Sequence, residues 1–119
     1  MFIMNDETGE QKVRQGDSYN FTVTGMDADW EVFYSVYNIE TQEIMLEVQS
    51  EKIEGGDRIN VPASECDKLT VPQGKKSMTY GWGLKRKKNG FEDTTIVKDR
   101  QAEDIIKIIV LPKITEGGV

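Results

Sequence analysis

Carboxylates are the side chains with which this sequence could do chemistry, because it offers little else. Its 119 residues include 21 acids, one cysteine and no histidine. The absence of histidine removes the commonest general base and the Ser-His-Asp and Cys-His nucleophile systems. The lone Cys66 can build neither a Cys₄ zinc site nor an internal disulfide, and we interpret it as a small buried side chain. The sequence therefore predicts a non-enzymatic protein without catalytic residues, metal ligands or a cofactor site.

Paired carboxylates are the one catalytic arrangement that the composition leaves open. Such a pair has to lie about 5 to 10 Å apart across a cleft. No two acids stand in an apolar stretch of the kind that raises a pKa. Asp27, Asp29 and Glu31 faintly resemble a calcium loop, yet the glycine and the twelfth-position glutamate of an EF-hand are missing. We favour an acidic turn here, and calcium binding by Asp27 and Asp29 stays open.

Two tryptophans and one basic run are the remaining candidates for binding. An exposed Trp30 or Trp82 beside Asp27 or Asp29 would form a platform for a sugar ring. Trp82 shares its strand register with other apolar residues, which favours packing in the core. The run KRKKNG at 85–90 lacks the aromatic interleaving of a nucleic-acid-binding face, so we interpret it as protection of a sheet edge.

Length and charge narrow the class of protein further. The chain has the size of one domain and can bury about two-thirds of its unfolded surface. Its 15 bases leave a net charge of −6, which speaks against general nucleic-acid binding and against adsorption to anionic membranes. We find no basic and apolar leader segment, and no run approaches the ~18 apolar residues of a membrane span.

Alternating apolar residues predict an all-β fold of about seven short strands. The predicted strands are residues 19–25, 30–38, 44–49, 58–61, 78–88, 91–97 and 105–111. Asn89 and Gly90 supply the two positive-φ positions of a type I′ hairpin turn, and one short helical turn is expected near 62–69. Turn signals every 8 to 12 residues favour an Ig-like antiparallel sandwich. We find no internal repeat.

The last predicted strand is the one hint of assembly. Its apolar residues lie on both faces, although a helical stripe that includes Ala102 fits the same segment. As a strand, it is either central in a sheet or meets another chain with its second face. The residues that we expect at such an interface are Ile106, Ile108 and Val110, with Gly81 and Gly83, where a flat backbone permits close packing.

The order of these pieces resembles a family of Ig-like β-sandwich modules in tail and baseplate proteins of phages and prophages of Gram-positive bacteria. The segment VRQGDSYNFTVTG is similar to the Arg-(x)-Gly-Asp opening and first strand of that family. The resemblance continues through WEVFYSVYN, RINVPASECDKL and PQGKKSMTYGWGLKRKKNGFEDT, and it ends with VLPKITEGG. It covers residues 13–115, although the segment between Thr95 and Pro112 is longer than in the family.

The resemblance implies that Arg14, Gly16 and Asp17 form a structural turn into the first long strand. Gly16 would supply backbone freedom and Asp17 would accept backbone N–H groups, while Arg14 would pair with an acid. It also implies a single domain over residues 13–115, with a partly flexible segment 1–12 and a flexible end at 116–119.

The resemblance further implies a non-enzymatic virion component that is made in the cytoplasm of the bacterial host and then built into the tail or baseplate. Its partners would be other virion proteins and copies of itself in a homo-oligomer, and neither nucleic acid nor membrane. A carbohydrate-binding β-sandwich with an exposed tryptophan is the alternative from another functional class.

Overall fold

Ten strands and one helical turn form the part of the chain that is described. The structure is a computed structural model, and it describes residues 1–95 and 105–114. The strands are β1 (Phe2–Met4), β2 (Gln11–Arg14), β3 (Tyr19–Val23), β4 (Glu31–Tyr37), β5 (Ile44–Gln49), β6 (Glu51–Ile53), β7 (Gly56–Val61), β8 (Met78–Lys88), β9 (Phe91–Thr95) and β10 (Ile106–Leu111). The helical turn α1 (Ala63–Cys66) follows Pro62. All seven predicted strands are present, while β1, β2 and β6 are strands that the sequence pattern does not reveal.

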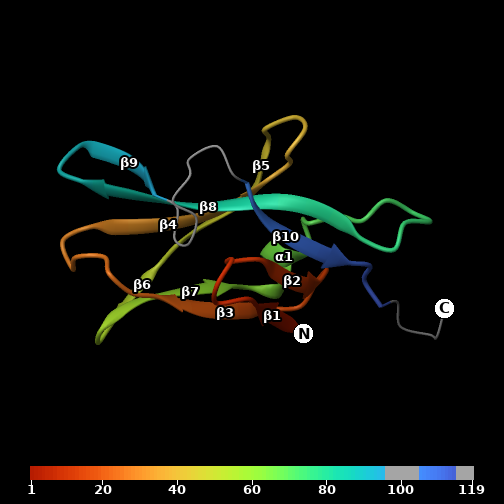
Figure 1. The fold of residues 1–119 in the computed structure, drawn as a ribbon, viewed down its shortest axis with the longest axis horizontal. Coiled ribbons are helices and arrows are strands. Elements are labelled where there is room, and N and C mark those ends of the chain that lie inside the picture. The colour runs from red at the N-terminus through yellow and green to blue at the C-terminus, as the bar shows by residue number, and fades with distance from the viewer. Residues whose placement is uncertain (96–104, 115–119) are drawn as a thin grey trace.

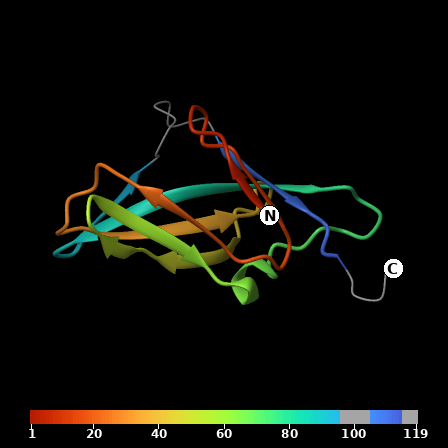
Figure 2. The same ribbon diagram turned by 90° about the horizontal axis from the view of Figure 1, so that it is seen from below.

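The strands form two sheets that face each other (Figures 1 and 2). The larger sheet has the order β1-β2-β10-β8-β4-β5, and β9 pairs with β8 further along that strand. The smaller sheet has the order β3-β7-β6. The fold is therefore the β-sandwich that the sequence predicts, with one departure. Strand β10 runs parallel to β2, an arrangement open to strands that no tight turn connects.

The core lies between the sheets and is built around aromatic rings. The ring of Tyr34 lies 5.1 Å from that of Phe21 and 5.5 Å from that of Trp82, measured between centroids. All three side chains are buried, and edge-on or tilted contacts of this kind add to the stabilisation from burial. The hydroxyl of Tyr34 donates to Oε1 of buried Gln11 at 2.7 Å and lies 2.9 Å from that of Tyr19. These three polar side chains inside the core thus satisfy one another.

The first twelve residues form a hairpin, β1–β2, where the sequence predicts a partly flexible segment. Phe2 stacks on Tyr19 of the smaller sheet with ring centroids 4.7 Å apart, and Met4 packs against the core. The sandwich therefore includes residues before 13, because an apolar residue of a very short strand closes the gap between the two sheet edges. Residues 98–104 and 116–119, on which the sequence predicts a loop and a flexible end, lie outside the described residues.

The predicted turns are confirmed where the structure describes them. Asn89 and Gly90 have φ of +49° and +86°, as a type I′ turn requires. The last segment forms the strand β10 and not a helix, because it pairs with β2 and β8 on its two sides. Gly56 in β7 shows a different constraint: a Cβ there would meet the carbonyl oxygen of Val23 at 2.5 Å. This position therefore has no room for a side chain.

Two hairpin loops, Asn5–Glu10 and Asn38–Glu43, have the same conformation and the same sequence pattern, Asn-x-Glu-Thr-x-Glu. In each loop the asparagine Oδ1 accepts the N–H groups of the residues two and three positions later. The fifth position has positive φ in both, +81° at Gly9 and +66° at Gln42. The sequence thus contains a six-residue repeat, and the expectation that it has no internal repeat is wrong at this short length.

Candidate functional site

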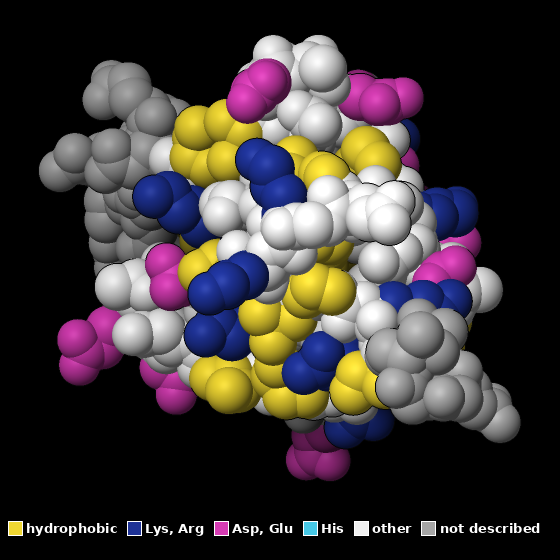
Figure 3. Space-filling view, turned by 90° about the vertical axis from the view of Figure 1, so that its right-hand side faces the viewer, with side chains coloured by type: hydrophobic (Ala, Val, Ile, Leu, Met, Phe, Trp, Pro, Cys, Tyr) yellow, Lys and Arg dark blue, Asp and Glu magenta, His cyan; other side chains and the backbone are white. Residues whose placement is uncertain are grey.

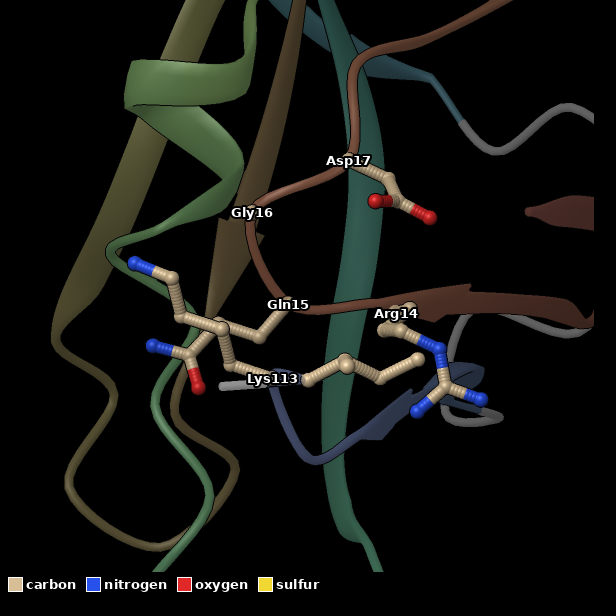
Figure 4. Close-up of a pocket in the computed structure, with 6 residues that line it drawn as sticks. Arg14, Gln15, Gly16, Asp17 and Lys113 are labelled. Atoms are coloured by element: carbon tan, nitrogen blue, oxygen red, sulfur yellow. The ribbon is translucent and has the colours of Figure 1, made fainter. Parts of the chain in front are cut away.

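The turn between β2 and β3 holds the charged residues that the sequence singles out (Figure 4). Gly16 has φ of +89°, which confirms the turn, since residues with side chains rarely adopt this conformation. Arg14 pairs with no acid among the described residues, and its guanidinium donates to the carbonyl of Pro112 at 2.9 Å. In the described part of the chain, Asp17 accepts no backbone N–H. Its carboxylate contacts the Met1 amino group at 2.5 Å, and its own N–H donates to the Arg14 carbonyl at 3.1 Å.

A shallow depression of about 320 Å³ lies beside this turn. Lys113 at its rim forms an ion pair with Asp67 at 2.7 Å. The Gln15 amide donates to the carbonyl of Asp67 at 2.8 Å. These contacts, with that of Arg14, join the ends of β2 and β10 to the segment after α1. The polar side chains at this turn therefore have a structural role, because their described contacts are with other residues of the same chain.

Cys66 is buried beside the same turn, as the sequence predicts. Its Sγ donates to the carbonyl of Arg14 at 3.5 Å. Burial raises the pKa of the Cys66 thiol, and backbone hydrogen bonds from Gly16 and Asp17 offset this only in part. A nucleophilic cysteine needs a lowered pKa, so the environment of Cys66 is the opposite of the one that cysteine catalysis requires.

The acidic turn before β4 does not gather its carboxylates around one point. Asp29 forms an ion pair with Lys88 at 3.3 Å, and Lys52 donates to the backbone carbonyl of Asp27 at 3.4 Å. Within residues 1–95 and 105–114, no group of three or more potential metal-ligating side chains is present. These contacts favour the ordinary acidic turn at Asp27 and Asp29.

Asp57 is a buried carboxylate that the sequence pattern does not reveal, because it follows the turn Gly55-Gly56 and looks like part of it. Only 1% of its surface is exposed. Its Oδ2 accepts from Lys52 and from the Ser50 hydroxyl, each at 2.7 Å. Its Oδ1 has no hydrogen-bond partner in the described part of the chain. Through these contacts the Asp57 carboxylate connects β6 and β7 to Ser50, which follows β5. A two-carboxylate mechanism would need a second carboxylate across a cleft from it.

The two tryptophans differ in what their rings can offer a ligand. Trp82 is buried in the core, as its register predicts, and its Nε1 donates to the carbonyl of Gly9 at 3.0 Å. Trp30 is half-buried, and the guanidinium of Arg86 lies 4.4 Å from its ring centroid. Lys88 lies 5.7 Å from the same ring. A sugar platform at Trp82 is therefore wrong, and at Trp30 a cation already occupies the ring.

The basic run at the β8–β9 hairpin contacts aromatic side chains that lie far from it in the sequence. Besides the two cations on Trp30, Lys87 lies 5.1 Å from the ring centroid of Phe33. Lys87 also forms an ion pair with Glu92 at 3.0 Å, which raises the pKa of the lysine and lowers that of the glutamate. Three of the four bases in the run, Arg86, Lys87 and Lys88, thus contact residues of the same chain, in keeping with an edge-protecting role.

The interface that we expect on the last strand needs correction. The side chains of Ile106, Ile108 and Val110 are 5%, 0% and 0% exposed, because they point into the core of this chain. Strand β10 is central, between β2 and β8. Since side chains alternate along a strand, its outward side chains are those one position away. Surface contacts by this strand therefore belong to the other register.

The two glycines of β8 lie on the same outward face but have different surroundings. A Cβ on Gly81 would meet the ring of Tyr37, whose Cζ lies 2.5 Å from that position. The close packing expected at Gly81 is thus with a side chain of the same molecule. At Gly83 nothing lies within 4 Å of the position that a Cβ would take, so this stretch of backbone remains open on the face of the sheet.

An outward surface on β1, β2 and β10 combines apolar and basic side chains. We define the outer patch as Ile3, Lys12, Ile105, Lys107, Ile109 and Leu111. The register places Ile3, Lys12 and Ile109 side by side across three strands. Ile3 and Ile105 are 59% and 42% exposed. A depression of about 310 Å³ adjoins Ile3 and Lys12. No described carboxylate forms an ion pair with Lys12 or Lys107.

The end of the molecule at which β10 finishes shows the same mixture. Hydrophobic side chains alternate with lysine and arginine across the middle of this end, and the carboxylates lie toward its rim (Figure 3). The β4–β5 loop protrudes at the top of Figures 1 and 3, with acidic side chains on both of its sides. Apolar and basic surface in one region, with acids in another, is an arrangement suited to protein contacts.

Comparisons with known proteins add no family to these observations. No family model matches the sequence, and a search of curated proteins finds no match to it. Among the described residues, no helix is long and apolar enough to cross a membrane. The candidate functional site is therefore defined by its geometry, and it is the outer patch.

Proposed function

We propose that this chain is a non-enzymatic structural component of a phage or prophage virion, associated with the tail or baseplate, and that it acts through protein–protein contacts. The outer patch carries this proposal. Its apolar side chains lie on a rigid sheet, and contiguous apolar surface of this kind is typical of sites of protein association. The assignment to a virion rests on the resemblance of residues 13–115 to tail and baseplate modules.

The arrangement of polar groups supports a role in binding over one in catalysis. The thiol of Cys66 is buried with a raised pKa, and Asp57 is tied to Lys52. At the depression beside the β2–β3 turn, the lining residues Gln15 and Lys113 both bond to Asp67 of the same chain. A sugar-binding module is the weaker candidate, because Trp30 stacks with Arg86.

Particles of the phage or prophage that encodes the chain provide the test. We expect mass spectrometry of purified particles to recover the chain at a constant ratio to the major tail protein. A chain that is abundant in the lysate but absent from purified particles would contradict the proposal. Density-gradient fractions without particles serve as the control for carry-over.

A further inference from the structure

We infer that the outer patch binds the β4–β5 loop of a second copy of this chain, in a head-to-tail contact that can propagate. This inference deepens the proposed function, on which it rests, by naming the partner and the two surfaces. The β4–β5 loop is residues 38–43, with Glu40 and Glu43 exposed and with Ile44 directly after it 55% exposed. In the proposed contact, the acidic loop and exposed Ile44 of one copy would lie against the lysines and apolar side chains of the outer patch of the next.

Charge complementarity favours this pairing of surfaces. The outward positions of β1, β2 and β10 carry three bases, Lys12, Arg14 and Lys107, and no acid. The whole chain nevertheless has a net charge of −6, so acids outnumber bases among its other residues. Opposite potentials on two patches steer association and fix its register. A second copy supplies the acidic partner that the patch requires.

The same charges exclude a symmetric contact of patch with patch. A two-fold axis through the outer patch would place Lys12 and Lys107 of one copy against those of the other. Like charges held together in this way oppose association. The contact is therefore between different surfaces, and such heterologous contacts produce rings when the rotation closes and filaments when it does not.

The β4–β5 loop fits the patch better than the related β1–β2 loop. The β1–β2 loop borders the patch of its own chain, because Glu10 lines the same depression as Ile3 and Lys12. It is also followed by buried Gln11, whereas exposed Ile44 follows the β4–β5 loop. Of these two loops, the β4–β5 loop alone thus offers a carboxylate pair directly before an exposed apolar side chain, at a protruding tip (Figure 1).

Nucleic acid is a poorer occupant of the patch. Phosphates would neutralise Lys12 and Lys107, but they would leave Ile3, Ile105 and Ile109 without apolar cover. The outer patch has no aromatic side chain on which a base could stack. A protein surface can supply both carboxylates for the lysines and apolar side chains for the isoleucines.

Charge reversal on each surface tests the inference. One variant carries Lys12→Glu with Lys107→Glu, and a second carries Glu40→Lys with Glu43→Lys. A third variant combines all four substitutions and so keeps the net charge of the natural chain. The matched controls are Lys75→Glu with Lys76→Glu, and Glu51→Lys with Glu54→Lys, which make the same changes in net charge at exposed positions elsewhere. Circular dichroism confirms that each variant is folded.

Light scattering after size-exclusion chromatography, from micromolar to near-millimolar protein, reports the mass. We expect the natural chain and both controls to associate with rising concentration, and the association to weaken with salt. Each two-site reversal should weaken association by about a hundredfold or more, and the four-site variant should restore it. A strictly monomeric natural chain, reversals without effect, or a four-site variant that fails to associate would each overturn the inference. Binding of a labelled oligonucleotide at the patch of a monomer would overturn it as well.

These outcomes are separate from those of the particle experiment. A chain that is present in purified particles but monomeric at all concentrations retains the proposed function and loses this inference. A chain that associates through these two surfaces but is absent from particles loses the assignment to a virion. The two ideas therefore fail independently.

Discussion

Tyr34 combines complete burial with two hydrogen-bond contacts of its hydroxyl inside the core. It is fully buried, and desolvation raises the pKa of its phenol well above the ordinary value, with a further contribution from the neighbouring Tyr19. Burial raises the pKa of Tyr19 in the same direction. Because Tyr34 donates its proton to Gln11, Tyr19 is the donor in the contact between the two hydroxyls. The network requires both phenols to stay protonated.

This network predicts a loss of stability in alkaline solution. In the unfolded chain a phenol ionises near pH 10, whereas the folded chain holds these two in the protonated form. Their contribution is therefore complete below about pH 10 and is lost as the pH rises further. Tyr34→Phe should reduce that loss by up to about 1.4 kcal/mol per pH unit. At neutral pH it should cost about 1 to 3 kcal/mol, since Gln11 loses its donor. Urea unfolding of both proteins from neutral to alkaline pH measures these effects, and equal slopes would show that Tyr34 is not held protonated.

At the scale of elements, the two Asn-x-Glu-Thr-x-Glu loops show that one local sequence pattern satisfies the backbone N–H groups of a hairpin loop in the same way at two places. Asn5 and Asn38 each accept two backbone N–H groups that would otherwise be left to water. Asparagine suits this position because its short side chain reaches N–H groups two residues on. The loops differ in their fifth residue, where Gln42 adopts the positive φ that glycine takes at Gly9.

Equal chemistry in the two loops predicts equal consequences when it is removed. Asn5→Ala and Asn38→Ala should each lower the free energy of unfolding by about 1 kcal/mol, because two N–H groups lose a shared acceptor. Asn→Asp at either position should recover most of that loss, since a carboxylate oxygen accepts in the same place. Thermal and urea unfolding of the four variants measure the effect. A large difference between the loops would mean that tertiary contacts, and not the turn, determine their stability.

At the scale of the whole molecule, β10 joins parts of the chain that are far apart in sequence. It lies between β2 and β8, and it presents opposite faces to the core and to the surroundings. Its inward side chains complete the core, and its outward side chains form half of the outer patch. One strand thus connects the stability of the sandwich to the surface that we propose for assembly.

Neighbouring positions on β10 should therefore separate stability from association. Ile108→Ala should lower the free energy of unfolding by about 2 to 5 kcal/mol, because Ile108 is fully buried. Ile109→Ala should cost about 1 kcal/mol or less and should weaken association of the folded chain. Urea unfolding and light scattering on the same samples measure both quantities. The reverse order of the two stabilities would show that the register of β10 is wrong.

The sequence by itself determined the all-β class and the main strands, because alternation of apolar residues is a local signal. It also determined the turn at Asn89-Gly90, where particular residue types favour positive φ, while the turn at Gly16 was implied by the family resemblance. The buried role of Trp82 followed from its register in the same way. Strands of three or four residues, such as β1 and β2, carry too little alternation to be recognised. Their positions depend on tertiary contacts, such as the stacking of Phe2 on Tyr19 and the pairing of β2 with β10.

Only the tertiary structure decided which face of the last strand meets the core. In the sequence, Ile105 to Leu111 is apolar in both registers, and a shift of one residue exchanges the two faces. Pairing with β2 and β8 sets the register and buries Ile108, so the half-buried Ile109 becomes the outward candidate. The partner of Arg14 and the burial of Asp57 were decided in the same way, since both depend on residues that the fold brings together from distant parts of the chain.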